Sequence, residues 1–199
     1  MIKLCIFDMG GVMIRDFHIA PRLFLFLGFT QGSFAEIDPL LGEAMAAHGR
    51  GEITEDEFWR KYTEISGRAI PPHEGSLLGK FFTPRMDEPT VAVVRELKKR
   101  GMRVVAGTNV IDAHYEAHQR LKQYDIFDKV YASHLMGIAK PDPAFYTHIL
   151  EAEGLGPKEA FFTDDVKENA DAAAKLGLAA FTYTDAATLR SHLAAADIS

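Results

Sequence analysis

The sequence predicts an α/β fold in which helices cover a parallel sheet. Two observations support this prediction: short apolar runs alternate with helical patterns over most of the chain, and the helical patterns begin and end at residues that favour helix termini. The chain has 199 residues, enough for one domain with a modest insertion. With 47% apolar and 25% charged residues, its composition is that of an ordinary soluble globular protein and excludes a disordered or collagen-like chain.

Five apolar runs are predicted to form the strands of the sheet. Helical segments separate most of them, so the repeated unit is strand, loop and helix. The predicted strands cover residues 3–7, 103–106, 129–132, 160–163 and 179–183.

Three helices of this repeat carry clear start and stop residues. Proline is favoured in the first turn, aspartate as the cap, and glycine just after the last turn. The first helix starts at Pro89 and stops at Gly101, the second starts at Asp142-Pro143 and stops at Gly154, and the third covers residues 168–176 and stops at Gly177.

The segment 15–87 does not follow the strand, loop and helix repeat, because it has helical periodicity without a convincing strand between its helices. Thr54 and Glu57 predict a capping box for a helix that Gly67 ends. A second box, Ser33 with Glu36, competes with a helix start at Asp38-Pro39, and the sequence leaves both open. Residues 67–79 are rich in proline and glycine and predict an irregular return path. We therefore expect a core of residues 1–14 and 88–199 and a helical subdomain of residues 15–87.

Charge and cysteine content exclude several function classes. Lys and Arg number 22 against 28 Asp and Glu, a net charge of −6, and no basic block suggests a nucleic-acid surface. Cys5 is the single cysteine, so an intrachain disulfide is excluded and a core position is expected. Asp8 and two glycines interrupt the apolar start of the chain, and other apolar stretches are shorter than the ~18 residues that cross a bilayer. We expect a cytoplasmic protein that binds neither nucleic acid nor membrane.

Polar residues follow four of the predicted strands or lie in the loops after them. Each group alone has an ordinary explanation as a turn, a helix cap or a surface lysine. In a parallel sheet, however, the carboxyl ends of the strands meet at one edge, where open α/β folds bind ligands. The groups are Asp8 with Gly10 and Gly11, Thr108 with Asn109, Lys140, and Asp164 with Asp165.

These carboxylates predict a metal site. Asp8, Asp164, Asp165 and Lys140 would together carry a charge of about −2, and two carboxylates ~4 Å apart repel by roughly 4 kcal/mol at an effective dielectric of 20. A divalent cation removes that repulsion, and oxygen ligands without nearby cysteine favour Mg²⁺. The ion would in turn attract a phosphate. The hypothesis requires Asp8 to lie within ~8 Å of the acidic pair, since Mg²⁺ bonds are ~2 Å long.

In this order and spacing, the four groups resemble the four motifs of the haloacid dehalogenase-like hydrolases, most of which are Mg²⁺-dependent phosphatases. The resemblance spans nearly the whole chain, and the segment 15–87 is similar to the small cap domain of that family. It implies a Rossmann-like, doubly wound sheet and hydrolysis of a small phosphomonoester through an aspartyl-phosphate. The sequence at residues 7–12, 51–54, 108–109 and 162–165 is similar to that of a branch of the family that includes α-D-glucose-1-phosphate phosphatases. This similarity implies a hexose 1-phosphate as substrate.

The resemblance also assigns roles to individual residues. It implies that Asp8 is the nucleophile, that Thr108 donates to a phosphoryl oxygen, and that Lys140 neutralises phosphate charge. The implied phosphate-binding residues are Met9, Gly10, Gly11, Thr108, Asn109 and Lys140. The implied Mg²⁺ ligands are Asp8, the carbonyl of Gly10, Asp164 and Asp165, with Asn169 orienting a water.

Gly10 departs from the family pattern. Most members carry there a second aspartate that acts as general acid and base, a contribution of ~10²–10⁴ in rate. The metal contact through the backbone carbonyl survives, but proton transfer does not. Either another group supplies the proton, or the leaving group needs little help, as with the anomeric oxygen of a sugar 1-phosphate.

Two other functions remain open. A 2-haloacid dehalogenase shares the nucleophile but, by the same resemblance, works without metal and has an aromatic residue where Gly10 stands; the pair Asp164-Asp165 argues against it. A catalytically weak module that binds a phosphorylated ligand is the second. We expect a small phosphorylated metabolite as partner and a monomer or homodimer. Residues 15–18 either line the entrance or form a hinge with one solvated charge pair, and the sequence leaves both open. We expect Phe58 and Trp59 in the core of the helical subdomain, and His114 and His118 on an exposed helix face.

Overall fold

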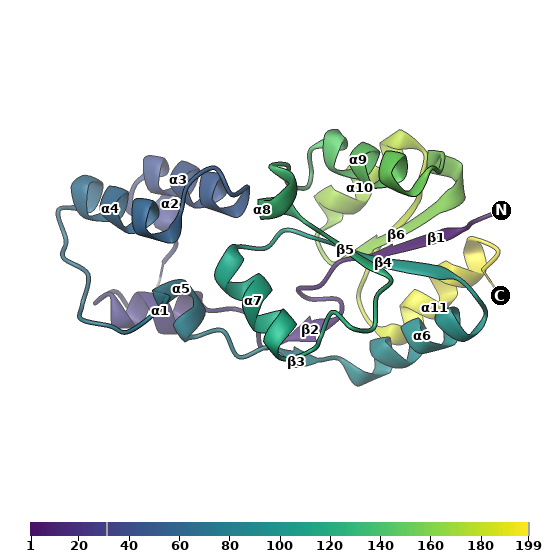
Figure 1. The fold of residues 1–199 in the computed structure, drawn as a ribbon, viewed down its shortest axis with the longest axis horizontal. Helices are drawn as coiled ribbons and strands as arrows, with labels where there is room; N and C mark the ends of the chain where they lie inside the picture. Colours follow the sequence, from purple (N-terminus) through teal and green to yellow (C-terminus); the bar gives the residue numbers. More distant parts are fainter. Residues whose placement is uncertain (31, 199) are drawn as a thin grey trace.

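A five-stranded parallel sheet forms the centre of the computed structural model, which describes residues 1–30 and 32–198. The strand order is β5-β4-β1-β6-β7 (Figure 1), so the first strand of the chain lies in the middle. All five predicted strands are confirmed to within two residues. They are β1 (Leu4–Phe7), β4 (Arg103–Thr108), β5 (Lys129–Ala132), β6 (Ala160–Asp164) and β7 (Ala179–Thr182).

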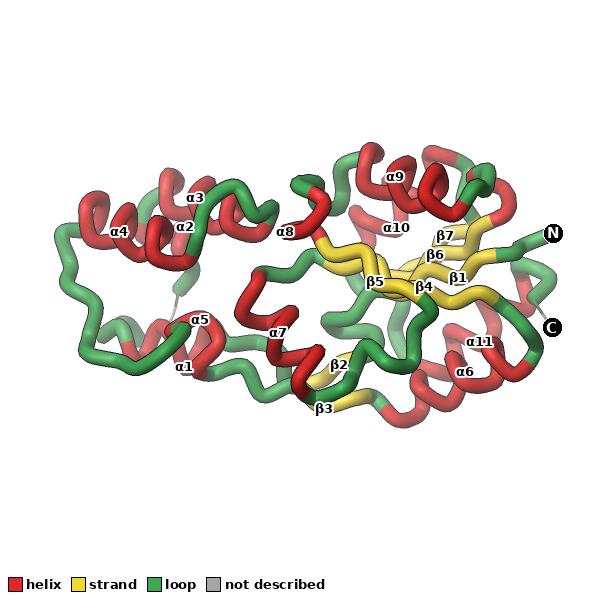
Figure 2. Tube along the Cα trace, in the orientation of Figure 1, coloured by secondary structure: helices red, strands yellow, loops and turns green. Residues whose placement is uncertain are grey.

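Helices cover both faces of the sheet, as the predicted doubly wound α/β fold requires. Helices α9 (Pro143–Glu153) and α10 (Lys167–Leu176) lie on one face, and α6 (Glu88–Lys99) and α11 (Ala186–Ala195) on the other (Figure 2). Because strand side chains alternate, β1 is buried on both sides. Cys5 and Phe7 pack in the cluster with α6 and α11, whereas Leu4 and Ile6 pack in the cluster with α9.

The Asp142 cap and the Gly177 stop act as predicted, whereas α6 starts one residue before Pro89 and is capped by Asp87, which was not predicted. The Asp87 carboxylate accepts the N–H of Thr90 and caps α6, and the Asp142 carboxylate accepts the N–H of Ala144 and caps α9. Gly177 ends α10 in the left-handed region at φ 99°, which only glycine adopts readily. Cys5 is a fully buried core residue, and burial raises the pKa of its thiol to about 12.

The described residues of the segment 15–87 form five helices, which lie to one side of the sheet (Figure 1). Both competing helix starts are used: Ser33 and Glu36 form a capping box on α2, and Asp38, the residue after α2, caps α3. Thr54 and Glu57 form the predicted box on α4, which Gly67 ends. The helices are α1 (Ala20–Phe26), α2 (Phe34–Ile37), α3 (Pro39–Gly49), α4 (Glu55–Ser66) and α5 (Leu77–Lys80).

Two details of this segment differ from the prediction. The return path is not irregular throughout, because Ser76 caps the short helix α5. A two-residue strand, β3 (Arg85–Met86), pairs antiparallel with β2 (Ile14–Arg15). This small second sheet lies where the chain passes from residues 1–14 into the segment 15–87 and where it returns. Strands this short carry too few side chains for an alternating pattern to show.

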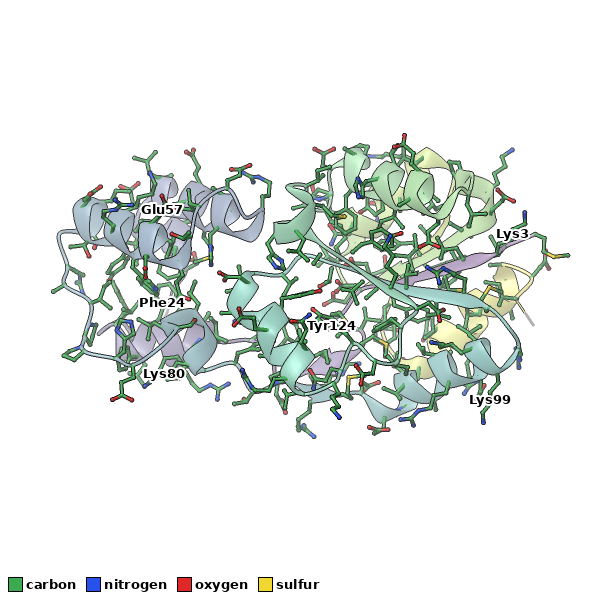
Figure 3. The ribbon with its side chains drawn as sticks, in the orientation of Figure 1. Lys3, Phe24, Glu57, Lys80, Lys99 and Tyr124 are labelled. Carbon is green, nitrogen blue, oxygen red and sulfur yellow. The ribbon has the colours of Figure 1, made fainter. Side chains whose placement is uncertain are left out.

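The helices α1 to α5 share a hydrophobic core of their own. Phe58 and Trp59 are buried in it as predicted, with Phe34 packed edge-on against both rings. Figure 3 shows Phe24 between α1 and the layer formed by α2, α3 and α4. We propose on this basis that residues 15–87 form a cap over a core of residues 1–14 and 88–199, and we call residues 15–87 the cap below. No helix among the described residues has the length and apolar composition needed to span a membrane.

Candidate active site

The strand register brings the predicted site residues to one edge of the sheet. Phe7 pairs with Ala106 of β4 and with Thr163 of β6, and the N–H of Asp8 donates to the Thr163 carbonyl at 3.0 Å. Asp8 therefore leaves β1 between the ends of its two neighbouring strands. The last residues of those strands are Thr108 and Asp164.

Lys140 reaches the same edge from the loop between α8 (Ser133–Met136) and α9. Its ammonium donates to Asp8 Oδ1 and Asp164 Oδ2, each at 2.6 Å, and to the carbonyl of Gly107 at 2.9 Å. All three of its N–H groups are thus used. The three side chains are buried, with Asp8 10%, Lys140 1% and Asp164 1% exposed. Burial disfavours a charged lysine, but the two carboxylates outweigh it and raise the pKa of Lys140, so the group stays an ammonium.

Asp164 is held from two further directions. Its Oδ1 accepts the backbone N–H of Val166 at 2.9 Å and the side-chain amide of Asn169 at 3.0 Å. The N-terminal end of α10 thereby fixes this carboxylate. Asn169, which the family resemblance assigns to a water, directly positions Asp164.

Three carboxylates converge beside Lys140. Asp8, Asp164 and Asp165 each offer one oxygen, and these oxygens lie within 4.8 Å of one another. The separation satisfies the distance condition stated above for a shared ion. Gly11 makes room for this arrangement: its φ is +74°, and a Cβ at this position would overlap the Asp165 carboxylate.

The charges at this edge do not balance without a cation. Burial raises the pKa of Asp8 to about 7, and neighbouring Asp164 adds to the rise, while Lys140 opposes it. Burial and Asp164 also raise the pKa of Asp165. A divalent cation shared by the three oxygens would supply the missing positive charge. The all-oxygen donor set fits a hard ion such as Mg²⁺.

Asn109 has a role that the sequence did not reveal. Its Oδ1 accepts the backbone N–H of Lys140, and its Nδ2 donates to the Lys140 carbonyl, both at 2.9 Å. The amide therefore holds the backbone of the lysine that bridges Asp8 and Asp164. A pairing across 31 residues leaves no local pattern that sequence reasoning could detect.

The loop after β1 is packed differently from the predicted phosphate loop. The Met9 side chain is in the hydrophobic core, so only its backbone faces the site, where its N–H bonds to Asp8. The ring of Phe17 lies over Gly10: a Cβ there would be 3.0 Å from Phe17 Cε2. The Arg15 guanidinium donates to the carbonyl of Gly11 and to the hydroxyl of Tyr183, so it connects this loop to the residue after β7.

The expectation of an exposed face for His114 and His118 was wrong. Both lie on α7 (Asp112–Arg120), and His118 is only 3% exposed. The ring of His114 stacks on Phe82 with centroids 3.7 Å apart, and its Nε2 lies 3.1 Å from the Leu78 carbonyl. The chain returning from the cap covers α7, a tertiary contact that helical spacing cannot predict.

The family model of the haloacid dehalogenase-like hydrolases matches residues 2–177. The chain belongs to this family. The chain is accordingly an enzyme, a hydrolase of this family.

Relatives of known activity cover nearly the whole chain. A sesquiterpene phosphatase of Aspergillus oryzae is 30% identical over 92% of this chain and 90% of its own length. A D-ribitol-5-phosphate phosphatase of Bacteroides thetaiotaomicron is 24% identical over 97% of both chains. Among solved structures, the magnesium complex of a HAD family enzyme of Bacteroides thetaiotaomicron is 25% identical, with a TM-score of 0.71 over 92% of this chain and 93% of that one.

We expect the variant Asn109→Ala to destabilise the protein by about 1–3 kcal/mol, because it removes two hydrogen bonds that hold the Lys140 backbone. Urea unfolding of the wild type and variant measures the difference. The control Gln119→Ala removes an exposed amide of α7 and should change the free energy of unfolding by less than about 0.5 kcal/mol. Equal effects of the two substitutions would show that the Asn109 amide does not stabilise this loop.

Proposed function

We propose that the protein is a Mg²⁺-dependent phosphatase that hydrolyses a small phosphomonoester through an aspartyl-phosphate at Asp8. The observation that carries the proposal is the convergence of three carboxylate oxygens within 4.8 Å beside the buried ammonium of Lys140. The phosphatase relatives and the magnesium complex of the structural neighbour support it.

The residues present fit the metal that the family implies. Asp8, Asp164 and Asp165, with the carbonyl of Gly10, would hold Mg²⁺. When bound, the ion would offset the charge of the carboxylates and of the phosphate oxygens.

Asp8 is the proposed nucleophile. An ionised carboxylate needs no base to attack phosphorus, and attack forms an O–P bond as the bond from phosphorus to the leaving alcohol oxygen breaks. Water then attacks the acyl phosphate, which releases inorganic phosphate and restores the carboxylate. Lys140 holds Asp8 Oδ1 in place throughout, so the orientation of the nucleophile is set before substrate arrives.

The remaining predicted roles follow from position. Thr108, buried at the end of β4, would donate its hydroxyl to a phosphoryl oxygen, and Lys140 would offset phosphate charge. Backbone N–H groups near Gly10 and Gly11 and the amide of Asn109 would provide further donors. The expected partner stays a small phosphorylated metabolite, and the oligomeric state, monomer or homodimer, stays a prediction.

Because glycine has no acidic side chain, residue 10 cannot donate the proton that the leaving alcohol oxygen takes up, and no residue is assigned to this step. The hexose 1-phosphate suggested by the branch resemblance stays a prediction, since its anomeric oxygen needs little protonation. The relatives do not choose a substrate class, because one acts on a sesquiterpene phosphate and another on a polyol phosphate.

Chelation tests the metal requirement. We expect EDTA to abolish hydrolysis of phenyl phosphate and added Mg²⁺ to restore it, because the carboxylates cannot approach phosphate without a compensating cation. Phosphate release is the measurement. Hydrolysis of a 2-haloacid that persists in EDTA would instead identify a dehalogenase.

Removing the nucleophile tests the covalent step. We expect Asp8→Asn to lower phosphate release at least about a thousandfold without unfolding the protein, since an amide is a poor nucleophile. Asp125→Asn, at an exposed position outside the site, is the matched control and should keep full activity. Undiminished turnover by purified Asp8→Asn would remove Asp8 from the mechanism. A burst of phosphoenzyme in the wild type with almost no steady turnover would indicate a binding module.

Gly10→Asp tests the missing acid. The new side chain must displace the Phe17 ring by a few tenths of an ångström, after which its carboxyl can protonate a leaving alcohol. We expect alkyl phosphates to be hydrolysed at least about tenfold faster, while p-nitrophenyl phosphate, whose leaving group needs no proton, changes little. Gly10→Asn controls for the added volume, and an equal response of both variants would show that the acid is irrelevant.

A further inference from the structure

A cavity of about 620 Å³ lies between the cap and the sheet edge. Helices α1, α2 and α3 form its cap side, and the loop after β4 together with Ala139 and Lys140 forms its core side. Its size is that of pockets, roughly 300–1,000 Å³, that enclose a whole small ligand. Asn109 and Lys140 lie in its wall, so the cavity is adjacent to the candidate active site.

Most of the cavity wall is hydrocarbon. Apolar side chains come from α1, α2, α3 and α5 of the cap and from the loop after β4, and the polar side chains in the wall are fewer and scattered among them. The apolar side chains include Leu23, Phe24, Phe34, Met45, Leu78 and Ile111.

The polar side chains in the wall already have partners within the protein. The Ser33 hydroxyl accepts the N–H of Glu36, the Arg50 guanidinium donates to both oxygens of Glu52, the His114 ring bonds to the Leu78 carbonyl, and the Ser133 hydroxyl donates to the Gly49 carbonyl.

Charge is also scarce there. Burial lowers the pKa of His114 to about 4, so the ring is neutral at physiological pH. The Arg50 charge is compensated by Glu52 at 2.7 Å. Among the described residues of the wall, Lys140 is the buried charged residue that also contacts the carboxylates.

This wall suits one kind of leaving alcohol. A sugar buried here would lose the water bound to its hydroxyls and find few free hydrogen-bonding groups to replace it, a cost of about 1–3 kcal/mol per unsatisfied group. A hydrocarbon chain needs no such partners and gains from contact with the apolar side chains.

We propose that the substrate is the monophosphate ester of a hydrocarbon alcohol, with the phosphate at Asp8 and Lys140 and the carbon chain in the cavity beneath the cap. The inference rests on the proposed phosphatase function and replaces the hexose 1-phosphate as the expected substrate class. It also assigns the cap its part: the core recognises phosphate, and the cap selects the alcohol.

A chain-length series tests the proposal. Ethyl, butyl, hexyl and octyl phosphate, kept below micelle-forming concentrations with Mg²⁺, are compared with glucose 1-phosphate. We expect kcat/KM to rise about threefold to fourfold for each CH₂ that enters the cavity, and glucose 1-phosphate to be poorer than octyl phosphate. A flat series, or a preference for glucose 1-phosphate, would overturn the inference while leaving a phosphatase.

Binding separates this inference from the catalytic proposal. Titration calorimetry of Asp8→Asn with ethyl and octyl phosphate requires no turnover. Tighter binding of octyl phosphate, by about threefold per added CH₂, supports the apolar cavity even if the wild type hydrolyses nothing, in which case only the catalytic proposal fails. Equal affinity for the two esters would contradict the apolar cavity even in an active enzyme.

Filling the cavity identifies the place where the chain binds. Ala46 lies in the cavity wall on α3 with an exposed side chain, so Ala46→Phe projects into the cavity without removing core packing. We expect kcat/KM for octyl phosphate to fall more than tenfold and that for ethyl phosphate to stay within twofold.

Two further variants keep this test decisive. Ala152→Phe adds the same ring at an exposed position of α9 outside the cavity wall and should change neither substrate. Ala46→Leu is a smaller insertion that a helix accepts readily, and it serves if the phenylalanine variant does not fold. Equal losses for the octyl and ethyl esters in either Ala46 variant would contradict the proposal.

Discussion

The buried ammonium of Lys140, shared between Asp8 and Asp164, is the interaction on which the site depends. A lone buried charge costs several kcal/mol, so each of these groups can be buried only because the others are present. Neighbouring residues hold these groups in position. Asn109 bonds to the backbone of Lys140, and the N-terminal end of α10 holds Asp164 through the N–H of Val166 and the amide of Asn169. With Asp165, however, three carboxylates face one ammonium. The site therefore carries an excess of negative charge. A divalent cation would offset this excess and would then attract a phosphate.

The sheet supplies the precision that such a site needs. Because β1 is the central strand, Asp8 emerges between the ends of β4 and β6, and the backbone pairing with Thr163 continues to Asp8 itself. Strands fully buried on both faces leave their carboxyl ends little freedom to move. Side chains on such a frame can be held within the small tolerances that nucleophilic attack requires.

The cap has its own hydrophobic core and meets the sheet edge across the cavity, so the proposed phosphate chemistry and the proposed alcohol recognition belong to different parts of the chain. One direct link is Ser133, which accepts the N–H of Val110 after β4 and donates to Gly49 at the end of α3. This hydroxyl connects the wall of the cavity to the strand that ends in Thr108.

The sequence by itself determined the five strands of the sheet, several helix caps and stops, and the expectation that the candidate site residues converge at one edge. These depend on local patterns: apolar runs, caps such as Asp142, stops such as Gly177, and polar residues at strand ends, whose convergence follows from parallel topology. The helix starts at Ser33 and Asp38 seemed to compete only because two helices can share a boundary of a single residue. Tertiary structure alone decided that Asn109 holds Lys140, that Phe17 covers Gly10, that His118 is buried, and that the wall beneath the cap is mostly apolar. Each of these is a contact between residues whose approach depends on how whole elements pack, and neither spacing nor residue type records that packing.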